Sequence, residues 1–112
     1  MEVQCLRVKI KPGMTDEFIA FVKELQANQI HRVYETMGRE NVVVETIFLE
    51  RGEEADHILF YTRGAPRGEE DGEGPDSQMF VDPASADVIR KTWDSVQALE
   101  VLFDLERMPL DA

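Results

Sequence analysis

Apolar and polar residues follow a strand or helix period in six stretches of the chain. Apolar residues at every second position, or β-branched runs, predict strands, and apolar steps of three and four predict helices. In chain order the six stretches predict strand, helix, strand, strand, helix and strand: Val3–Lys11, Thr15–Met37, Asn41–Glu50, His57–Arg63, Pro83–Gln97 and Leu99–Met108.

The two predicted helices carry recognisable start and stop signals. Thr15 is the expected N-cap of the first, the acidic residues that follow it suit the positive end of a helix dipole, and Gly38 occupies the expected left-handed position after its end. Asp82 and Pro83 are typical of an N-cap followed by the first helical position. The sequence therefore predicts one long first helix and a shorter second one.

This order of elements is that of the split βαβ, or ferredoxin-like, plan. It predicts an α+β fold in which a four-stranded antiparallel sheet carries two helices on one face. With 112 residues, the chain is expected to form a single domain, 1–112. At about 64–78 the sequence is rich in glycine, proline and acidic residues, which predicts a mobile acidic loop because such a segment has little apolar surface to bury.

The composition excludes several classes of partner. The net charge of −11 argues against binding to nucleic acid or to an anionic membrane. The sequence shows no leader and no apolar run of membrane-spanning length, so a cytoplasmic location is expected. Cys5 is the only cysteine, which excludes a disulfide within one chain.

Three segments carry a resemblance to a known family: CLRVKIKPG at 5–13, VVVETIFLER at 42–51 and LEVLFDLER at 99–107. Together with the element order, they resemble a bacterial family of unknown function in the dimeric α+β barrel group of the ferredoxin-like folds. The resemblance spans Val3–Arg63 and Trp93–Met108, and the chain departs from it in the acidic segment, where such domains more usually carry helix. It implies a homodimer in which the uncovered sheet faces of two copies pack together. The wider group includes monooxygenases, haem-degrading enzymes, isomerases and proteins without known activity, so the resemblance selects no reaction.

Strand parity predicts which side chains occupy the sheet face away from the helices. Because side chains alternate at period two, placing Leu6, Val8 and Ile10 against the helices turns their neighbours outward. The side chains expected on the uncovered face are Cys5, Arg7, Lys9, Val43, Glu45, Ile47, Leu49, His57, Leu59 and Tyr61, with Leu102, Asp104 and Glu106 from the last strand.

Within that set, Arg7, Glu45, Tyr61 and Asp104 are expected to form a polar cluster. As a functional site, Arg7 would hold an anionic substrate, and Glu45 or Asp104 would act as a base whose pKa burial raises. The structural alternative is a charge-compensated interface in which Arg7 pairs with a carboxylate.

A second candidate site is a cleft between helix and sheet lined by Tyr34, His57 and Trp93. Core packing is the alternative explanation for the aromatic pair. The two histidines, His31 and His57, lack a third ligand at a convincing spacing, so no metal and no cofactor is expected.

Two functions from different classes remain. The chain is either a dimeric protein that binds or transforms a small organic molecule in the helix–sheet cleft, or a non-catalytic dimeric regulatory or interaction module. Whether it is an enzyme is left open. A deep cleft with converging polar groups would favour the first function, and a filled interior would favour the second.

Overall fold

The computed structural model describes residues 2–64 and 83–105. Within these residues the chain forms seven elements, which in order are β1 (Glu2–Ile10), α1 (Thr15–Asn28), α2 (Ile30–Arg39), β2 (Val42–Glu50), β3 (His57–Gly64), α3 (Pro83–Thr92) and β4 (Trp93–Ala98). The predicted α+β class is confirmed. The predicted acidic loop lies, except for Gly64, outside the described residues. No helix in the described ranges is long and apolar enough to cross a membrane.

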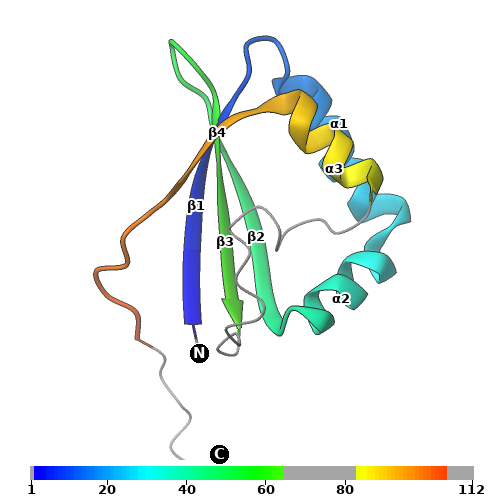
Figure 1. Ribbon diagram of the computed structural model, residues 1–112, viewed down its shortest axis with the longest axis vertical. Coiled ribbons are helices and arrows are strands. Elements are labelled where there is room, and N and C mark those ends of the chain that lie inside the picture. Colours follow the sequence, from blue (N-terminus) through cyan, green and yellow to red (C-terminus); the bar gives the residue numbers. More distant parts are fainter. Residues whose placement is uncertain (1, 65–82, 106–112) are drawn as a thin grey trace, which may run out of the picture.

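The four strands form one sheet in the order β2-β3-β1-β4, with every neighbouring pair antiparallel (Figure 1). Consequently β1 and β2 run parallel with β3 between them, and β3 and β4 run parallel with β1 between them. The central strands are thus β1 and β3, and the edges are β2 and β4. The predicted four-stranded antiparallel sheet is confirmed, and the ferredoxin-like grouping and the dimer stay predictions.

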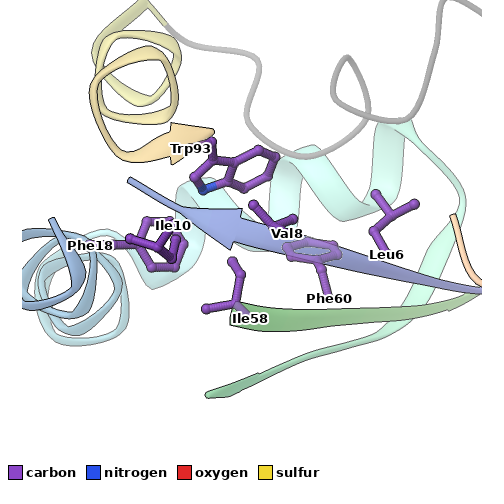
Figure 2. Close-up of a cluster of buried hydrophobic side chains, with 7 residues drawn as sticks. All are labelled: Leu6, Val8, Ile10, Phe18, Ile58, Phe60 and Trp93. Atoms are coloured by element: carbon purple, nitrogen blue, oxygen red, sulfur yellow. The ribbon is translucent and has the colours of Figure 1, made fainter. Parts of the chain in front are cut away.

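The core lies between one face of the sheet and the helices α1 and α3. Leu6, Val8 and Ile10 alternate along β1 and are buried, and the first two stand opposite Phe60 and Ile58 of β3. Phe18 from α1 and Trp93 at the start of β4 complete the buried cluster (Figure 2). Side chains from the strands, the helices and the β1–α1 loop pack around it: Met14, Phe21, Val22, Ile47, Val88 and Ile89. The predicted orientation of β1 is therefore confirmed.

The opposite face of the sheet, which none of the described helices covers and which we call the bare face, carries four cross-strand rows. From one end to the other these rows are Val44, Arg63 and Val3; Thr46, Tyr61 and Cys5; Phe48, Leu59 and Arg7; and Glu50, His57 and Lys9. The outward positions predicted for β1 and β3 are confirmed.

The outward positions predicted for β2 are wrong by one residue. Ile47 stands opposite Phe60 and packs against the core, and Glu45 stands opposite Thr62 on the same helix-covered face. The register shifts between Val42 and Val44, where a bulge-like irregularity interrupts the ladder. A one-residue shift moves every side chain of a strand to the other face, so Val43, Glu45, Ile47 and Leu49 are not the outward set.

The predicted first helix is two helices, so the fold has three helices rather than two in the described residues. α1 ends at Asn28, and α2 begins after Gln29, whose backbone (φ −127°, ψ 17°) leaves the helical region. Asn has a low helix propensity because its side chain competes for backbone groups, which favours a break here. None of the residues of α2 is buried, so little apolar contact opposes a change in helix direction.

The end of the chain also differs from the prediction. The helix over Pro83–Gln97 ends at Thr92, and the strand begins at Trp93 rather than Leu99, pairing with β1 from Ile10 to Leu6. Residues 99–105, including the predicted strand residues Leu102 and Asp104, belong to neither helix nor strand, and Glu106 lies outside the described residues. Ile89, Trp93 and Val96 have helical spacing, but aromatic and β-branched residues at the last two positions also suit a strand.

Candidate functional site

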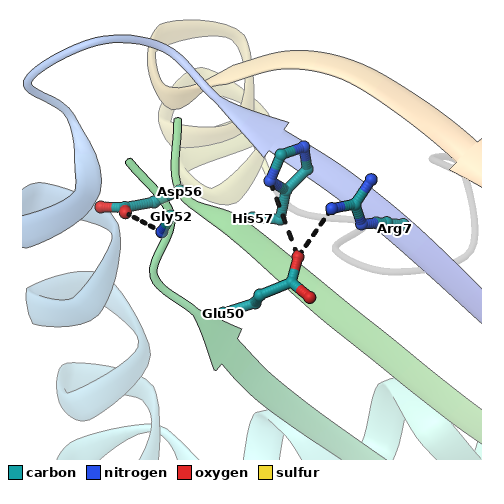
Figure 3. Close-up of polar contacts among 5 residues, drawn as sticks. All are labelled: Arg7, Glu50, Gly52, Asp56 and His57. Carbon is teal, nitrogen blue, oxygen red and sulfur yellow. Dashed lines mark hydrogen bonds and ion pairs between the residues drawn. The ribbon is translucent and has the colours of Figure 1, made fainter. Parts of the chain in front are cut away.

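The bare face near the β2–β3 turn carries a charged cluster around Glu50. Arg7 reaches across β3 and donates from Nη2 to Glu50 Oε1 at 2.7 Å, and His57 Nδ1 lies 3.8 Å from the same oxygen (Figure 3). The strand order explains the geometry, since Glu50 stands opposite His57 and Arg7 lies on the far side of the same central strand. The Arg7 and Glu50 side chains are 38% and 49% exposed, so a ligand can reach both.

The ion pair sets the charge state of Glu50. The hydrogen bond and the positive charge of Arg7, with a smaller contribution from His57, hold the pKa of Glu50 below its ordinary value. Glu50 therefore stays ionised at neutral pH and fixes the position of the Arg7 guanidinium. A guanidinium has five N–H donors, so Arg7 can also donate to the carboxylate of a ligand.

The turn beside this cluster is held by Asp56. Its carboxylate accepts a hydrogen bond from Thr15 Oγ1 at 2.7 Å and one from the Gly52 N–H at 3.2 Å, which ties the turn to the start of α1. The hydrogen bond from Thr15 is the largest of the interactions that hold the pKa of Asp56 below its ordinary value. Gly52 is required because a Cβ there would lie 2.5 Å from the Ala55 carbonyl oxygen. The turn is thus anchored to the core side of the molecule.

A groove of about 470 Å³ lies over this cluster. Its lining combines the basic side chains with two carboxylates and the turn backbone: Arg7, Lys9, Glu50, Arg51, Gly52, Glu54, Ala55 and His57. Lys9 lies 3.8 Å from Asp94 of β4. The groove therefore gathers Arg7, Lys9, Arg51 and His57 on a chain whose net charge is −11.

The predicted cluster of Arg7, Glu45, Tyr61 and Asp104 does not form. Arg7 and Tyr61 share the bare face, but Glu45 lies on the helix-covered face and Asp104 pairs with Arg63 at 2.6 Å. The prediction was wrong for the two acids because it assigned the wrong parity to β2 and extended the last strand past Ala98. The partner of Arg7 is Glu50, five residues beyond Glu45 on the same strand.

Glu45 has a strongly shifted pKa. Burial on the helix-covered face raises its pKa from 4.5 to about 7. The predicted direction of this shift is confirmed, although Glu45 is not near Arg7. Its cross-strand neighbour Thr62 pairs in turn with Gln4, so the row around Glu45 is polar but carries no basic side chain from β1 or β3.

The residues predicted to line a helix–sheet cleft do not converge. Tyr34 is exposed on α2, His57 lies on the bare face, and Trp93 is buried with its ring 6.2 Å from that of Phe18. Core packing thus accounts for Trp93. Cys5 is half-buried, and burial raises the pKa of its thiol, as expected for an unreactive cysteine.

A second cavity, of about 430 Å³, lies at the opposite end of the sheet. It is lined by backbone and side chains of Glu2, Val3, Gln4, Glu40, Asn41, Val42, Thr62, Gly64, Val101 and Asp104. Its carboxylates make it a poor site for an anion. Among residues 2–64 and 83–105, no group of three or more His, Cys, Asp and Glu side chains is placed to hold a metal ion.

The sequence placed Arg7, Lys9 and His57 on the uncovered face, but Glu50 and Arg51 were missed as their neighbours. The sequence could have indicated these neighbours, because Glu50 and Arg51 come directly before the turn that leads to His57. A hairpin register that pairs Glu50 with His57 would have revealed the cluster.

These features define a small α+β protein whose open four-stranded sheet is covered by helices on one face and carries a charged groove on the other. The chain matches DUF6176, a family of unknown function, over residues 1–109, and it belongs to that family. Comparison with curated proteins gave no match, and comparison with solved structures gave none either.

Proposed function

We propose that this protein is a cytoplasmic, ferredoxin-like homodimer of the dimeric α+β barrel kind, and that it binds a small organic carboxylate in the groove beside Arg7. The proposal moves the expected ligand site from the helix–sheet cleft to the bare face. Binding is the proposed activity, and no reaction step is assigned.

The fold and the dimer are supported by the sheet. The order β2-β3-β1-β4 places two parallel strand pairs in interleaved positions, as expected for two split βαβ units. On the bare face Phe48 is 53% exposed and stands opposite Leu59, and Val44 is exposed at the β2 edge. An apolar strip of this kind is typical of an interaction surface. A stable dimer interface buries at least about 1,000 Å² in total, so this strip would form one part of it.

The ligand class rests on one observation, the convergence of Arg7, His57 and Lys9 on a groove of about 470 Å³. That volume falls within the range of small-molecule sites, which is about 300–1,000 Å³. The groove holds the permanent cations Arg7, Lys9 and Arg51 against the carboxylates of Glu50 and Glu54, so on a chain of net charge −11 it attracts small anions more strongly than most of the surface does.

The chemistry of Arg7 favours a carboxylate within this class. Glu50 takes one guanidinium edge through Nη2, which holds the plane of the side chain in place. A second carboxylate can then accept parallel hydrogen bonds from another edge, with His57 and Lys9 beside it. A neutral amide of the same shape would lose the charge-assisted bonds, which gives a matched comparison.

Binding is tested by titrating the protein with a panel of small mono- and dicarboxylates and with the corresponding amides, followed by amide NMR shifts. We expect at least one carboxylate to bind with shifts around Arg7 and His57, and its amide to bind at least tenfold more weakly. Arg7→Met should weaken the carboxylate at least tenfold. Arg90→Met, which changes an exposed arginine on α3, on the helix-covered side of the sheet and not in the groove lining, should leave the affinity unchanged.

Two results would contradict the ligand proposal. One is that no carboxylate shifts the groove resonances at millimolar concentration. The other is that Arg7→Met and Arg90→Met bind the carboxylate equally well, which would remove Arg7 from the site.

The second candidate is a non-catalytic dimeric regulatory or interaction module. It is favoured by the filled space between the helices and the sheet, where Leu6, Phe60 and Trp93 are at most 6% exposed. A dimer in sedimentation experiments combined with no binding from the carboxylate panel would select this module over the binding protein.

A further inference from the structure

The stretch Leu99–Leu105, which we call the C-terminal arm, is the most exposed apolar segment of the described chain. Leu102, Phe103 and Leu105 are 88%, 81% and 75% exposed, and Leu99 and Val101 are also exposed. Large apolar side chains that stand singly on a surface need no explanation, but here five occur within seven residues.

The arm is nevertheless held in place at both ends. At its start the Leu99 N–H donates to the Cys5 carbonyl oxygen at 2.9 Å, which extends the β1–β4 ladder by one step. Near its end the Asp104 carboxylate accepts from Arg63 Nη2 at 2.6 Å, and only 28% of the Asp104 side chain and 20% of the Arg63 side chain are exposed. Leu102 and Phe103 therefore project from a segment whose two anchors fix its position.

We propose that the C-terminal arm seats on a second copy of this chain, with Leu102 and Phe103 against β2 of that copy near Val44. The inference rests on the proposed homodimer and deepens it, because it names the segment that holds the two copies together. Phe48 and Leu59 then form the centre of the interface, and the arms form its two ends.

The exposed area supports a second copy as the occupant. A large apolar side chain presents roughly 150–200 Å² when fully exposed, so the five side chains of the arm offer about 600 Å². A stable interface needs about 800 Å² from each partner. The arm and the Phe48–Leu59 strip together reach that area, whereas the strip alone does not.

Symmetry supports β2 as the seat. Asp104 is tied to Arg63, which stands between Val3 of β1 and Val44 of β2 in one cross-strand row. When two bare faces pack about a two-fold axis parallel to the strands, the β4 side of one sheet faces the β2 side of the other at the same height. The arm, which follows β4, then meets β2 of the second copy at the row of Val44.

The first test compares dimer dissociation constants by sedimentation equilibrium of the full chain. Leu102→Asp combined with Phe103→Asp should raise the dissociation constant at least a hundredfold. Tyr34→Asp, which changes an exposed aromatic residue on α2, is the control and should leave it within threefold. A wild-type dimer with an unchanged dissociation constant in the arm variant would overturn the role of the arm alone. A wild-type chain that is monomeric at 100 µM would instead overturn the proposed dimer.

The second test locates the seat by disulfide trapping in a Cys5→Ser background. Phe103→Cys together with Val44→Cys should give a covalent dimer on mild oxidation, and Phe103→Cys together with Tyr34→Cys should not. A covalent dimer that forms equally in both pairs, or in neither while the chain sediments as a dimer, would overturn the seat on β2.

Discussion

Replacing Glu45 with Gln should change how the stability of the protein depends on pH. Glu45 lies on the helix-covered face opposite Thr62, and burial raises its pKa from 4.5 to about 7. A raised pKa means that the folded protein binds this proton more tightly than the unfolded chain does. The wild-type protein therefore loses stability as the pH rises from about 4.5 to about 7, because ionising Glu45 in the fold costs desolvation energy.

The magnitude follows from the size of the shift. Each unit of difference between the folded and unfolded pKa corresponds to about 1.36 kcal/mol. A shift from 4.5 to about 7 therefore corresponds to about 3 kcal/mol of stability at a pH above both values. Residual contact of the carboxylate with solvent reduces the expected effect to about 2 kcal/mol. Gln has nearly the same shape and cannot ionise. Glu45→Gln should therefore be more stable than wild type by about 2 kcal/mol at pH 8 and nearly equal to it at pH 4.5.

Urea unfolding at pH 4.5, 5.5, 6.5 and 8, followed by the fluorescence of the buried Trp93, measures this difference. Protein concentration must be constant, because association would shift the midpoint. Glu35→Gln, which removes an exposed carboxylate on α2, is the matched control and should follow the wild-type pH profile. The acids with lowered pKa, Glu50 and Asp56, are present in both proteins, so their contributions cancel in the difference between Glu45→Gln and wild type. A free-energy difference between Glu45→Gln and wild type that does not grow between pH 4.5 and pH 8 would refute the reasoning.

Three further predictions concern the core, the turn and the thiol. Phe60→Ala should lower the free energy of unfolding by about 3–5 kcal/mol in urea titrations, because it leaves a cavity among Leu6, Ile47 and their neighbours. A loss below about 1 kcal/mol would contradict this packing. Gly52→Ala should cost about 1–2 kcal/mol in the same assay, since the added Cβ meets the Ala55 carbonyl oxygen, and an unchanged midpoint would show that the turn is not held as described. At pH 8, Cys5 in the folded protein should react with an aromatic disulfide reagent at least tenfold more slowly than Cys5 in the protein unfolded in urea. The reason is that the thiol is half-buried and burial raises its pKa. Equal rates would contradict that burial.

Strand β1 could be predicted in detail because its alternation is clean. Leu6, Val8 and Ile10 are separated by polar or charged residues, so only one parity buries the apolar set. That parity placed Arg7 on the bare face, where the structure has it. The same argument placed His57 correctly on β3, whose apolar Ile58 and Phe60 alternate in the same way.

Strand β2 could not be predicted to the same level. Val42, Val43 and Val44 are equally apolar, so they do not indicate which residue faces the helices, and the register shift between Val42 and Val44 is a tertiary feature. The last helix and strand were predicted with wrong boundaries for a related reason. Trp93 continues the helical spacing of α3, and only its pairing with Ile10 of β1 shows that a strand has begun.

The register of β2 links these errors to the chemistry of the site. Glu45 and Glu50 are five residues apart on one strand, so period two places them on opposite faces of the sheet. On the helix-covered face burial raises the pKa of Glu45 to about 7, and on the bare face Arg7 lowers the pKa of Glu50. One glutamate therefore titrates near neutral pH while the other remains charged and keeps the Arg7 guanidinium in place. It follows that a change of pH between 6 and 8 acts on the stability of the fold through Glu45 and leaves the Arg7–Glu50 pair intact.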